Sequence, residues 1–168
     1  MPDVKGELLK ALQGSRAVML AKLDGLPEYD RRRPLTPSGT NLLGLVKHLT
    51  GLEYGYLGES LGRPPTERPS WFRDDPSTEI DMWATPDESS EYVVRTYQQA
   101  CAHSDNTINE LNLNSPAHVA HWAEGGQHTT LGVLLIRMVN ETAQHAGHAD
   151  IIRELIDEPS WTDDYRPR

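Results

Sequence analysis

The chain has 168 residues, close to the size of one average domain, and its formal net charge is −9. An acidic chain without a long basic run neutralises few phosphates, so we expect no nucleic-acid partner and no binding to an anionic membrane. The single cysteine, Cys101, excludes an intramolecular disulfide and a cysteine-rich zinc site. Because neither a leader nor a bilayer-spanning apolar run of ~20 residues is visible, we expect one soluble, cytoplasmic domain over residues 1–168.

The first two predicted helices each carry one apolar stripe and end at glycine and proline. The first covers residues 4–23 and ends before Gly25 and Pro27. The second begins near Thr40, a favourable cap, and runs to about residue 61. Its apolar face consists of Leu42, Leu45, His48, Leu49, Leu52 and Tyr56. We expect residues 29–39, between the two helices, to form a loop.

A long segment over residues 62–84 separates the second helix from the third. It is rich in proline and also carries Trp71, Phe72, Met82 and Trp83, whose apolar area argues against disorder. Loops of this length are commonly functional in compact domains, so the segment is either a cover that completes the core or a lid over a substrate. We further expect it to pass close to His48 on its way back to the third helix.

The third and fourth predicted helices complete the fold. Thr85, followed by Pro86 and Glu88, has the pattern of a capping box and predicts a helix over residues 85–111. After a polar loop, the fourth helix runs from about residue 129 to residue 157. Its stripe consists of Leu131, Leu134, Leu135, Met138, Thr142, His145, Ala149, Ile152 and Ile156. We therefore predict an all-α four-helix bundle without strands, with long loops after the second and third helices.

Three polar residues share helix faces with apolar side chains. Glu141 and His145 are four residues apart, so they lie on the same side of the fourth helix. His48 is flanked by leucines on the second helix and is also expected to face inward. Such groups are costly in an apolar core unless they bind a cation. Two imidazoles and one carboxylate suit zinc, with iron, nickel or manganese as alternatives, and three ligands leave one position for water or substrate.

The same residues allow other interpretations. A histidine on an apolar face is commonly a hydrogen-bonded core residue, and a Glu–His pair at this spacing is commonly a solvated face. His148 follows His145 by three residues, so these two imidazoles could form a second pair. Asp150 could then hold either ring by a hydrogen bond.

Two further candidate sites lie elsewhere in the chain. His118, His121 and His128 fall in or next to the polar loop that contains Trp122, and they could form a site of their own. Cys101 could act as a nucleophile, although nothing adjacent to it in the sequence would lower its pKa.

Several stretches resemble motifs of the DinB/YfiT-like metalloenzyme superfamily. Residues 41–49 are similar to its second-helix motif, and residues 141–155 are similar to its last-helix motif. Residues 81–84 and the loop around Trp122 resemble the branch that contains mycothiol-linked members. The resemblance covers nearly the whole chain and implies a left-twisted four-helix bundle that binds one divalent metal through three side chains.

The resemblance also implies a ligand set. Many relatives use three histidines, whereas the mycothiol-dependent maleylpyruvate isomerase branch uses His, Glu and His. This chain matches the latter with His48, Glu141 and His145, the same set that the helix faces suggest.

The function that the resemblance implies is S-transfer or isomerisation of a small electrophile with a low-molecular-weight thiol, such as mycothiol, as co-substrate. In this function His148 or Asp150 would orient groups or shuttle protons. Two alternatives remain open. One is a hydrolase that uses metal-bound water, and the other is a non-catalytic metal- or ligand-binding bundle, with a homodimer as one option.

Overall fold

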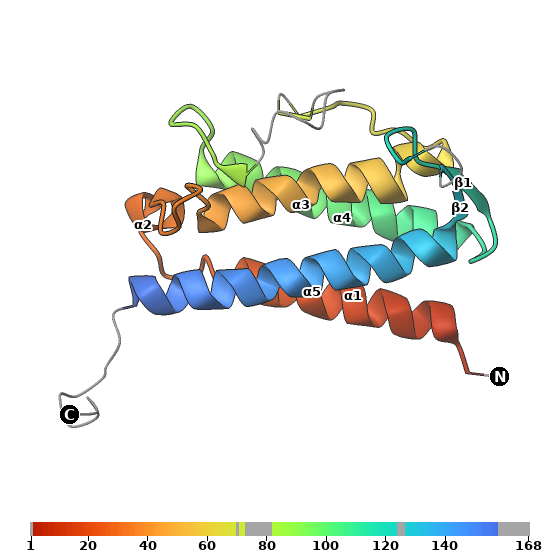
Figure 1. The fold of residues 1–168 in the computed structure, drawn as a ribbon, viewed down its shortest axis with the longest axis horizontal. Coiled ribbons are helices and arrows are strands. Elements are labelled where there is room, and N and C mark those ends of the chain that lie inside the picture. Colours follow the sequence, from red (N-terminus) through yellow and green to blue (C-terminus); the bar gives the residue numbers. More distant parts are fainter. Residues whose placement is uncertain (1, 70, 73–81, 124–126, 158–168) are drawn as a thin grey trace.

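Four long helices packed side by side form the body of the molecule (Figure 1). The computed structural model describes residues 2–69, 71–72, 82–123 and 127–157. The long helices are α1 (Val4–Ala21), α3 (Leu42–Leu57), α4 (Ser90–Glu110) and α5 (Leu131–Ile156). The shorter elements are α2 (Glu28–Arg32), the 3-10 helix η1 (Glu59–Leu61) and the strands β1 (Pro116–His118) and β2 (His128–Thr130). The predicted all-α bundle is confirmed, but the expectation that the chain forms no strand is wrong.

The observed boundaries differ from the predicted ones at several places. The first helix ends at Ala21, and the chain then turns through Gly25, whose φ of 72° is unfavourable for a residue with a side chain. The predicted second helix is divided at Gly58 into α3 and η1, and its N-cap is Asn41, whose Oδ1 accepts from the Gly44 amide at 2.8 Å. The expected loop over residues 29–39 begins with most of α2.

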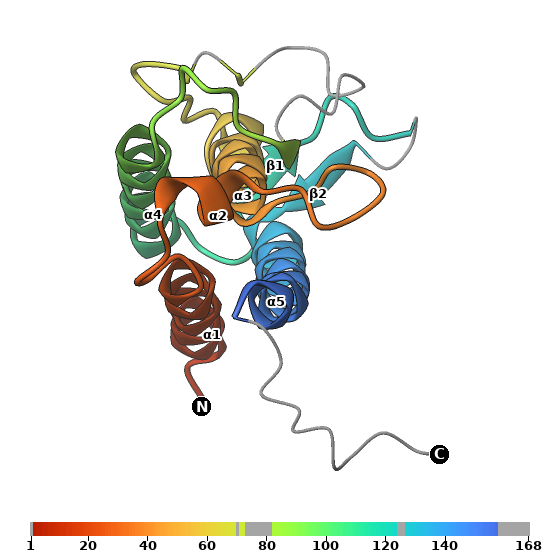
Figure 2. The same ribbon diagram turned by 90° about the vertical axis from the view of Figure 1, so that its left-hand side faces the viewer.

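The four long helices form two parallel pairs. Lys22, just after α1, forms an ion pair with Asp150 near the end of α5, so these helices run in the same direction. Lys47, near the start of α3, binds Glu88 just before α4 at 2.8 Å, so these two are also parallel. The end-on view in Figure 2 places α5 and α4 on either side of α1, with α3 diagonally across from it. A parallel neighbour requires a returning connection, which accounts for the long segment between α3 and α4.

The core lies between these helices and follows the predicted apolar stripes. The leucines of α3 other than Leu52 are fully enclosed, because α3 packs against both α4 and α5. On α5 the buried line consists of Leu131, Leu134, Leu135, Met138, Thr142, Ala146, Ala149 and Ile152. Of the helices that the structure describes, none has the length and apolar character needed to cross a bilayer.

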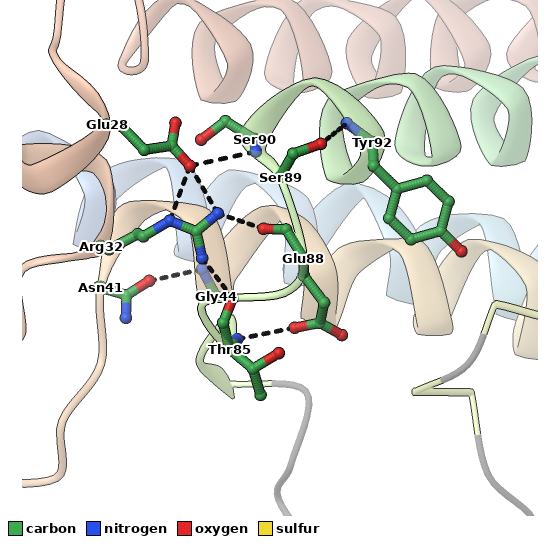
Figure 3. A network of polar contacts seen from close by, with 9 residues as sticks. All are labelled: Glu28, Arg32, Asn41, Gly44, Thr85, Glu88, Ser89, Ser90 and Tyr92. Atoms are coloured by element: carbon green, nitrogen blue, oxygen red, sulfur yellow. Dashed lines mark hydrogen bonds and ion pairs between the residues drawn. The ribbon is translucent and has the colours of Figure 1, made fainter.

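The start of the third long helix was predicted incorrectly, and Figure 3 shows why. The capping interaction does form, since the Thr85 amide donates to the Glu88 carboxylate at 2.8 Å. However, Arg32 of α2 donates to the carbonyls of Thr85 and Glu88, and these residues stay in a turn. The helix begins at Ser90, with Ser89 as its N-cap. A tertiary contact has therefore displaced the helix start by about one turn.

A closed network of charges lies in the interior between α1, α3 and α4. Arg16 donates two hydrogen bonds of 2.7 Å to the two carboxylate oxygens of Glu53, and a third of 2.5 Å to Asp105. The exposed fraction of the side chain is 6% for Arg16 and 0% for Glu53. We call these three residues the Arg16 network. Its charges compensate one another through two-pronged hydrogen bonding, a strong arrangement for an enclosed ion pair.

Candidate functional site

His48, Glu141 and His145 come together where α3 and α5 run antiparallel. The rings of His48 and His145 lie 4.9 Å apart between centroids, in an edge-to-face arrangement with an interplanar angle of 71°. Nε2 of His145 lies 3.8 Å from Oε2 of Glu141, one helical turn away. We call the line of contact between these two helices the α3–α5 seam. The structure thus brings the three predicted residues together from two helices.

These three side chains lie at the edge of the core rather than inside it. The side chain of Glu141 is 23% exposed and that of His145 is 12% exposed. The innermost line of α5 is instead occupied by Thr142 and Ala146, each one residue further along the helix. One residue corresponds to about 100° of rotation, which turns Glu141 and His145 toward the side of the bundle. The expectation that they face the interior is therefore only partly correct, and both side chains reach solvent.

The separations within this group can be compared with those of a metal site. Two donor atoms about 2.0–2.1 Å from one ion are at most about 4.2 Å apart, so Glu141 and His145, at 3.8 Å, could share an ion. Rings bound to one tetrahedral ion have centroids about 5 Å apart, close to the observed 4.9 Å. Within the described ranges, however, no three His, Cys, Asp or Glu side chains converge closely enough to hold a metal. Binding would therefore require side-chain adjustment.

His148 and Asp150, the two residues expected to assist, take different positions. Nδ1 of His148 lies 3.4 Å from Nδ1 of His145, with the rings 5.3 Å apart, so the predicted pair of imidazoles is present. The carboxylate of Asp150 forms an ion pair with Lys22, at the end of α1. His148 is thus in direct contact with the candidate site, whereas Asp150 is engaged at the neighbouring helix.

The ends of the long connecting segment pass over α3 on either side of His48. A Cβ atom on Gly44 would lie 1.9 Å from the Met82 carbonyl oxygen and 2.7 Å from the Trp83 Cα, so only glycine fits beneath this backbone. A Cβ atom on Gly51, one turn beyond His48, would lie 3.7 Å from the Phe72 ring, an ordinary packing distance. Residues 70 and 73–81, including Asp81 of the sequence motif, lie outside the described residues.

Two tryptophans of this segment have different environments. Trp71 is buried and contacts Tyr92 edge-to-face, with ring centres 5.5 Å apart, and the ammonium of Lys47 lies 5.2 Å from its ring centre. Lys47 also donates to the Trp83 carbonyl at 3.0 Å, which fixes this residue against α3. The Trp83 side chain is 53% exposed. Trp71 therefore completes the core, while the Trp83 backbone lies against Gly44, one helical turn from His48, and its side chain is open to solvent.

The alternative site built from three loop histidines is formed only in part. His118 and His128 are opposite each other in the antiparallel β1–β2 ribbon, and their rings are 5.1 Å apart. His121 instead packs on Tyr56, with ring centres 6.0 Å apart. The sequence pattern missed this pairing because each strand has only three residues.

A cluster that sequence reasoning did not identify lies further along the seam. The guanidinium of Arg137 lies 5.3 Å from the ring centre of Tyr56 and 5.2 Å from that of Trp122. The Trp122 indole N–H donates to the Tyr56 hydroxyl at a long 3.5 Å. The one available signal was the spacing, because Arg137 precedes Glu141 by four residues and therefore shares its helix face.

The environment of Cys101 is that of a structural residue. Burial, together with the nearby Glu53 carboxylate, raises the pKa of its thiol to about 12. A thiol with this pKa carries almost no thiolate at neutral pH, and the thiolate is the nucleophilic form. The interpretation of Cys101 as a nucleophile is therefore disfavoured.

Comparisons with known proteins agree with this architecture. A crystal structure described as a conserved protein of a locus from Enterococcus faecalis is similar to the chain with a TM-score of 0.67 and 13% identity. The similarity covers 94% of this chain and all of that one, which supports the fold. No curated protein sequence is significantly similar to the chain. The family model described as mycothiol-S-transferase matches residues 7–158. The chain therefore belongs to the mycothiol-S-transferase family.

Proposed function

We propose that this protein is a metal-dependent thiol S-transferase with mycothiol as its thiol, and that His48, Glu141 and His145 hold the metal. Family membership supports the thiol and the transfer reaction. The observation that carries the metal assignment is the approach of the His48 and His145 rings to 4.9 Å beside the Glu141 carboxylate. This donor set suits zinc best, with nickel, iron or manganese as alternatives.

The chemistry is the attack of a sulfur nucleophile on a small electrophile. A bound divalent ion would lower the pKa of a coordinated thiol and so keep thiolate available at neutral pH. The sulfur then forms a bond to the electrophilic carbon while the leaving group departs with its bonding electrons. His148, 3.4 Å from His145, orients that ring and accepts the proton that the thiol releases. A role for Asp150 in this proton transfer requires its ion pair with Lys22 to open.

The segment that crosses α3 supplies a wall beside this chemistry. Gly44 lets the Met82–Trp83 backbone lie directly on the helix, and Lys47 fixes the Trp83 carbonyl. The open indole of Trp83 can therefore shield a bound sulfur from water and contact the head group of the thiol. In this proposal the segment acts both as a core cover, through Trp71, and as a substrate wall, through Trp83.

Turnover of an electrophile panel by the zinc-loaded protein tests this function. Reactions contain mycothiol, another low-molecular-weight thiol, or no thiol. We expect mycothiol-dependent loss of the electrophile that disappears in Glu141→Gln and persists in the control Glu154→Gln, an exposed carboxylate of the same helix. Consumption of substrate without thiol would instead indicate hydrolysis by metal-activated water. Bound metal without any turnover would indicate a non-catalytic bundle.

A homodimer and a cytoplasmic location also belong to this proposal. Sedimentation equilibrium of the purified protein distinguishes a dimer from a monomer. Fractionation of cells that produce the untagged chain tests its location.

A further inference from the structure

The Arg137 side chain is held in a fixed position on the same seam as the candidate metal centre. Its guanidinium lies 5.3 Å from the ring centre of Tyr56 on α3 and 5.2 Å from that of Trp122 in the loop between the strands. Contacts between a cation and aromatic faces are attractive, and two of them restrict the orientation of the guanidinium. Neither contact uses the hydrogen-bond donors at the edge of the group.

Those donors are available to a ligand. A guanidinium has five N–H groups, yet within the described part of the chain Arg137 forms no hydrogen bond. Its nearest charged partner is Oε1 of Glu141, at 3.7 Å from Nη2, which is longer than a hydrogen bond. The side chain is 44% exposed. An oriented guanidinium with open donors matches the planar, two-pronged geometry of a carboxylate.

The register of the seam places Arg137 at a defined distance from the candidate metal centre. Tyr56 follows His48 by eight residues, and Arg137 precedes His145 by eight, so both pairs are two helical turns apart. Since α3 and α5 are antiparallel, the His48–His145 contact and the Tyr56–Arg137 contact are successive positions on one line. At about 1.5 Å per residue, Arg137 lies roughly 6 Å along the axis from Glu141 and roughly 12 Å from His145.

We propose that Arg137 binds a carboxylate of the electrophilic substrate, one to two helical turns from the carbon that sulfur attacks. This inference rests on the proposed function, because it assigns the substrate class of that same site. Arg137 would anchor the far end of the substrate, while the reacting carbon lies at His48, Glu141 and His145. Substrates of this class are small electrophiles that carry a carboxylate at the end opposite the leaving group.

A matched pair of electrophiles tests the assignment through a ratio of rates. The pair is 4-(chloromethyl)benzoate and its neutral amide, with mycothiol and the zinc-loaded full-length protein. We expect kcat/KM for the acid to exceed that for the amide by roughly ten- to a hundredfold. This factor corresponds to the free energy that one charge-assisted hydrogen bond contributes. The ratio should fall to near one in Arg137→Gln, mainly through KM, and recover in part in Arg137→Lys. The ratio should be unchanged in Arg95→Gln, an arginine on α4 that forms an ion pair with Glu91.

A binding measurement separates failure of this inference from failure of the proposed function. Titration with unreactive 4-methylbenzoate should change tryptophan emission saturably, and the change should be lost in Trp122→Phe and in Arg137→Gln. The neutral 4-methylbenzamide should produce no such change. If the carboxylate binds but no thiol supports turnover, the transferase proposal fails and the anion site stands. If turnover occurs without preference for the acid and without carboxylate binding, the role of Arg137 is overturned.

A third experiment tests whether the electrophile or the thiol carries the carboxylate that Arg137 binds. N-acetylcysteine and its amide are compared as thiols with one neutral electrophile. We expect no preference for the thiol acid that depends on Arg137. A preference of tenfold or more that disappears in Arg137→Gln would assign the carboxylate to the thiol and overturn its assignment to the electrophile.

Discussion

The Arg16 network and the α3–α5 seam both bring charged side chains from different helices together, but they satisfy those charges differently. In the Arg16 network every contact is short, at 2.5–2.7 Å, and Glu53 has no exposed side-chain area. On the seam, Glu141 lies 3.7 Å from Arg137 and 3.8 Å from His145, and it is 23% exposed. The same residue types are thus tightly paired in one region and loosely arranged in the other.

This difference separates a structural ion network from a candidate site. Charges in an enclosed region must be compensated by one another, because water is excluded and an unpaired charge there is very costly. Charges at the edge of the core can remain incompletely paired, because water or a ligand completes their interactions. We therefore expect substitutions in the Arg16 network to change stability, and substitutions on the seam to change ligand binding.

The largest expected effect on stability is that of Glu53→Gln. Removing this carboxylate leaves the Arg16 charge enclosed with only Asp105 as its partner, and the expected loss in the free energy of unfolding is roughly 3–5 kcal/mol. Urea unfolding measures this loss. The control Glu110→Gln removes an exposed partner of Arg63 and should cost about 1 kcal/mol or less. Equal losses in both variants would contradict the assignment of Glu53 as an enclosed structural charge.

A smaller loss is expected for Gly44→Ala. The added Cβ would lie 1.9 Å from the Met82 carbonyl oxygen, so the backbone that crosses α3 must move, at a cost of about 1–3 kcal/mol. Gly55→Ala is the matched control on the same helix. Nothing lies within 4 Å of its Cβ position, and alanine there should stabilise the helix by about 0.5–1 kcal/mol. A neutral Gly44→Ala in thermal unfolding would mean that the segment does not rest on α3.

The smallest change in stability is expected for Glu141→Gln in metal-free protein. Among the described residues, this carboxylate has only long, partly exposed ionic contacts, so its neutralisation should alter the free energy of unfolding by about 1 kcal/mol or less. The measurement compares wild type and variant by urea unfolding in the presence of a chelator. Repeating it with zinc should reveal a deficit in the variant, because it binds the ion more weakly. An equal deficit with and without zinc would identify Glu141 as a structural partner.

Much of the fold could be predicted from the sequence because apolar periodicity is a local signal. Most of the stripe on α5 follows from this pattern, and so does its start, which was expected near residue 129 and lies at Leu131. The start of α4 could not be predicted in the same way. Thr85 and Glu88 form the expected capping contact, but Arg32, more than fifty residues away, competes for the carbonyls. A contact between residues this far apart in the sequence cannot be predicted from the pattern of neighbouring residues.

The candidate site could likewise be predicted from the sequence only in part. The helical spacing of Glu141 and His145, together with the apolar flanks of His48, was sufficient to predict that His145 approaches both Glu141 and His48. Their position at the edge of the core was not, because it depends on how α5 is rotated against α3. The contacts of Arg137 depend on three separate segments, so its role could be inferred only from the structure.

The most direct test of the central claim is zinc stoichiometry and affinity, measured by calorimetry and elemental analysis. We expect one ion per chain in wild type, and a loss of affinity in His48→Ala and His145→Ala that exceeds the roughly 100-fold typical of losing an outer hydrogen-bond partner. The matched control is the double variant His118→Ala and His128→Ala, which removes a close histidine pair away from the seam and should still bind one ion. Loss of zinc in that control, with retention in His48→Ala and His145→Ala, would contradict the assignment of the metal centre to the α3–α5 seam.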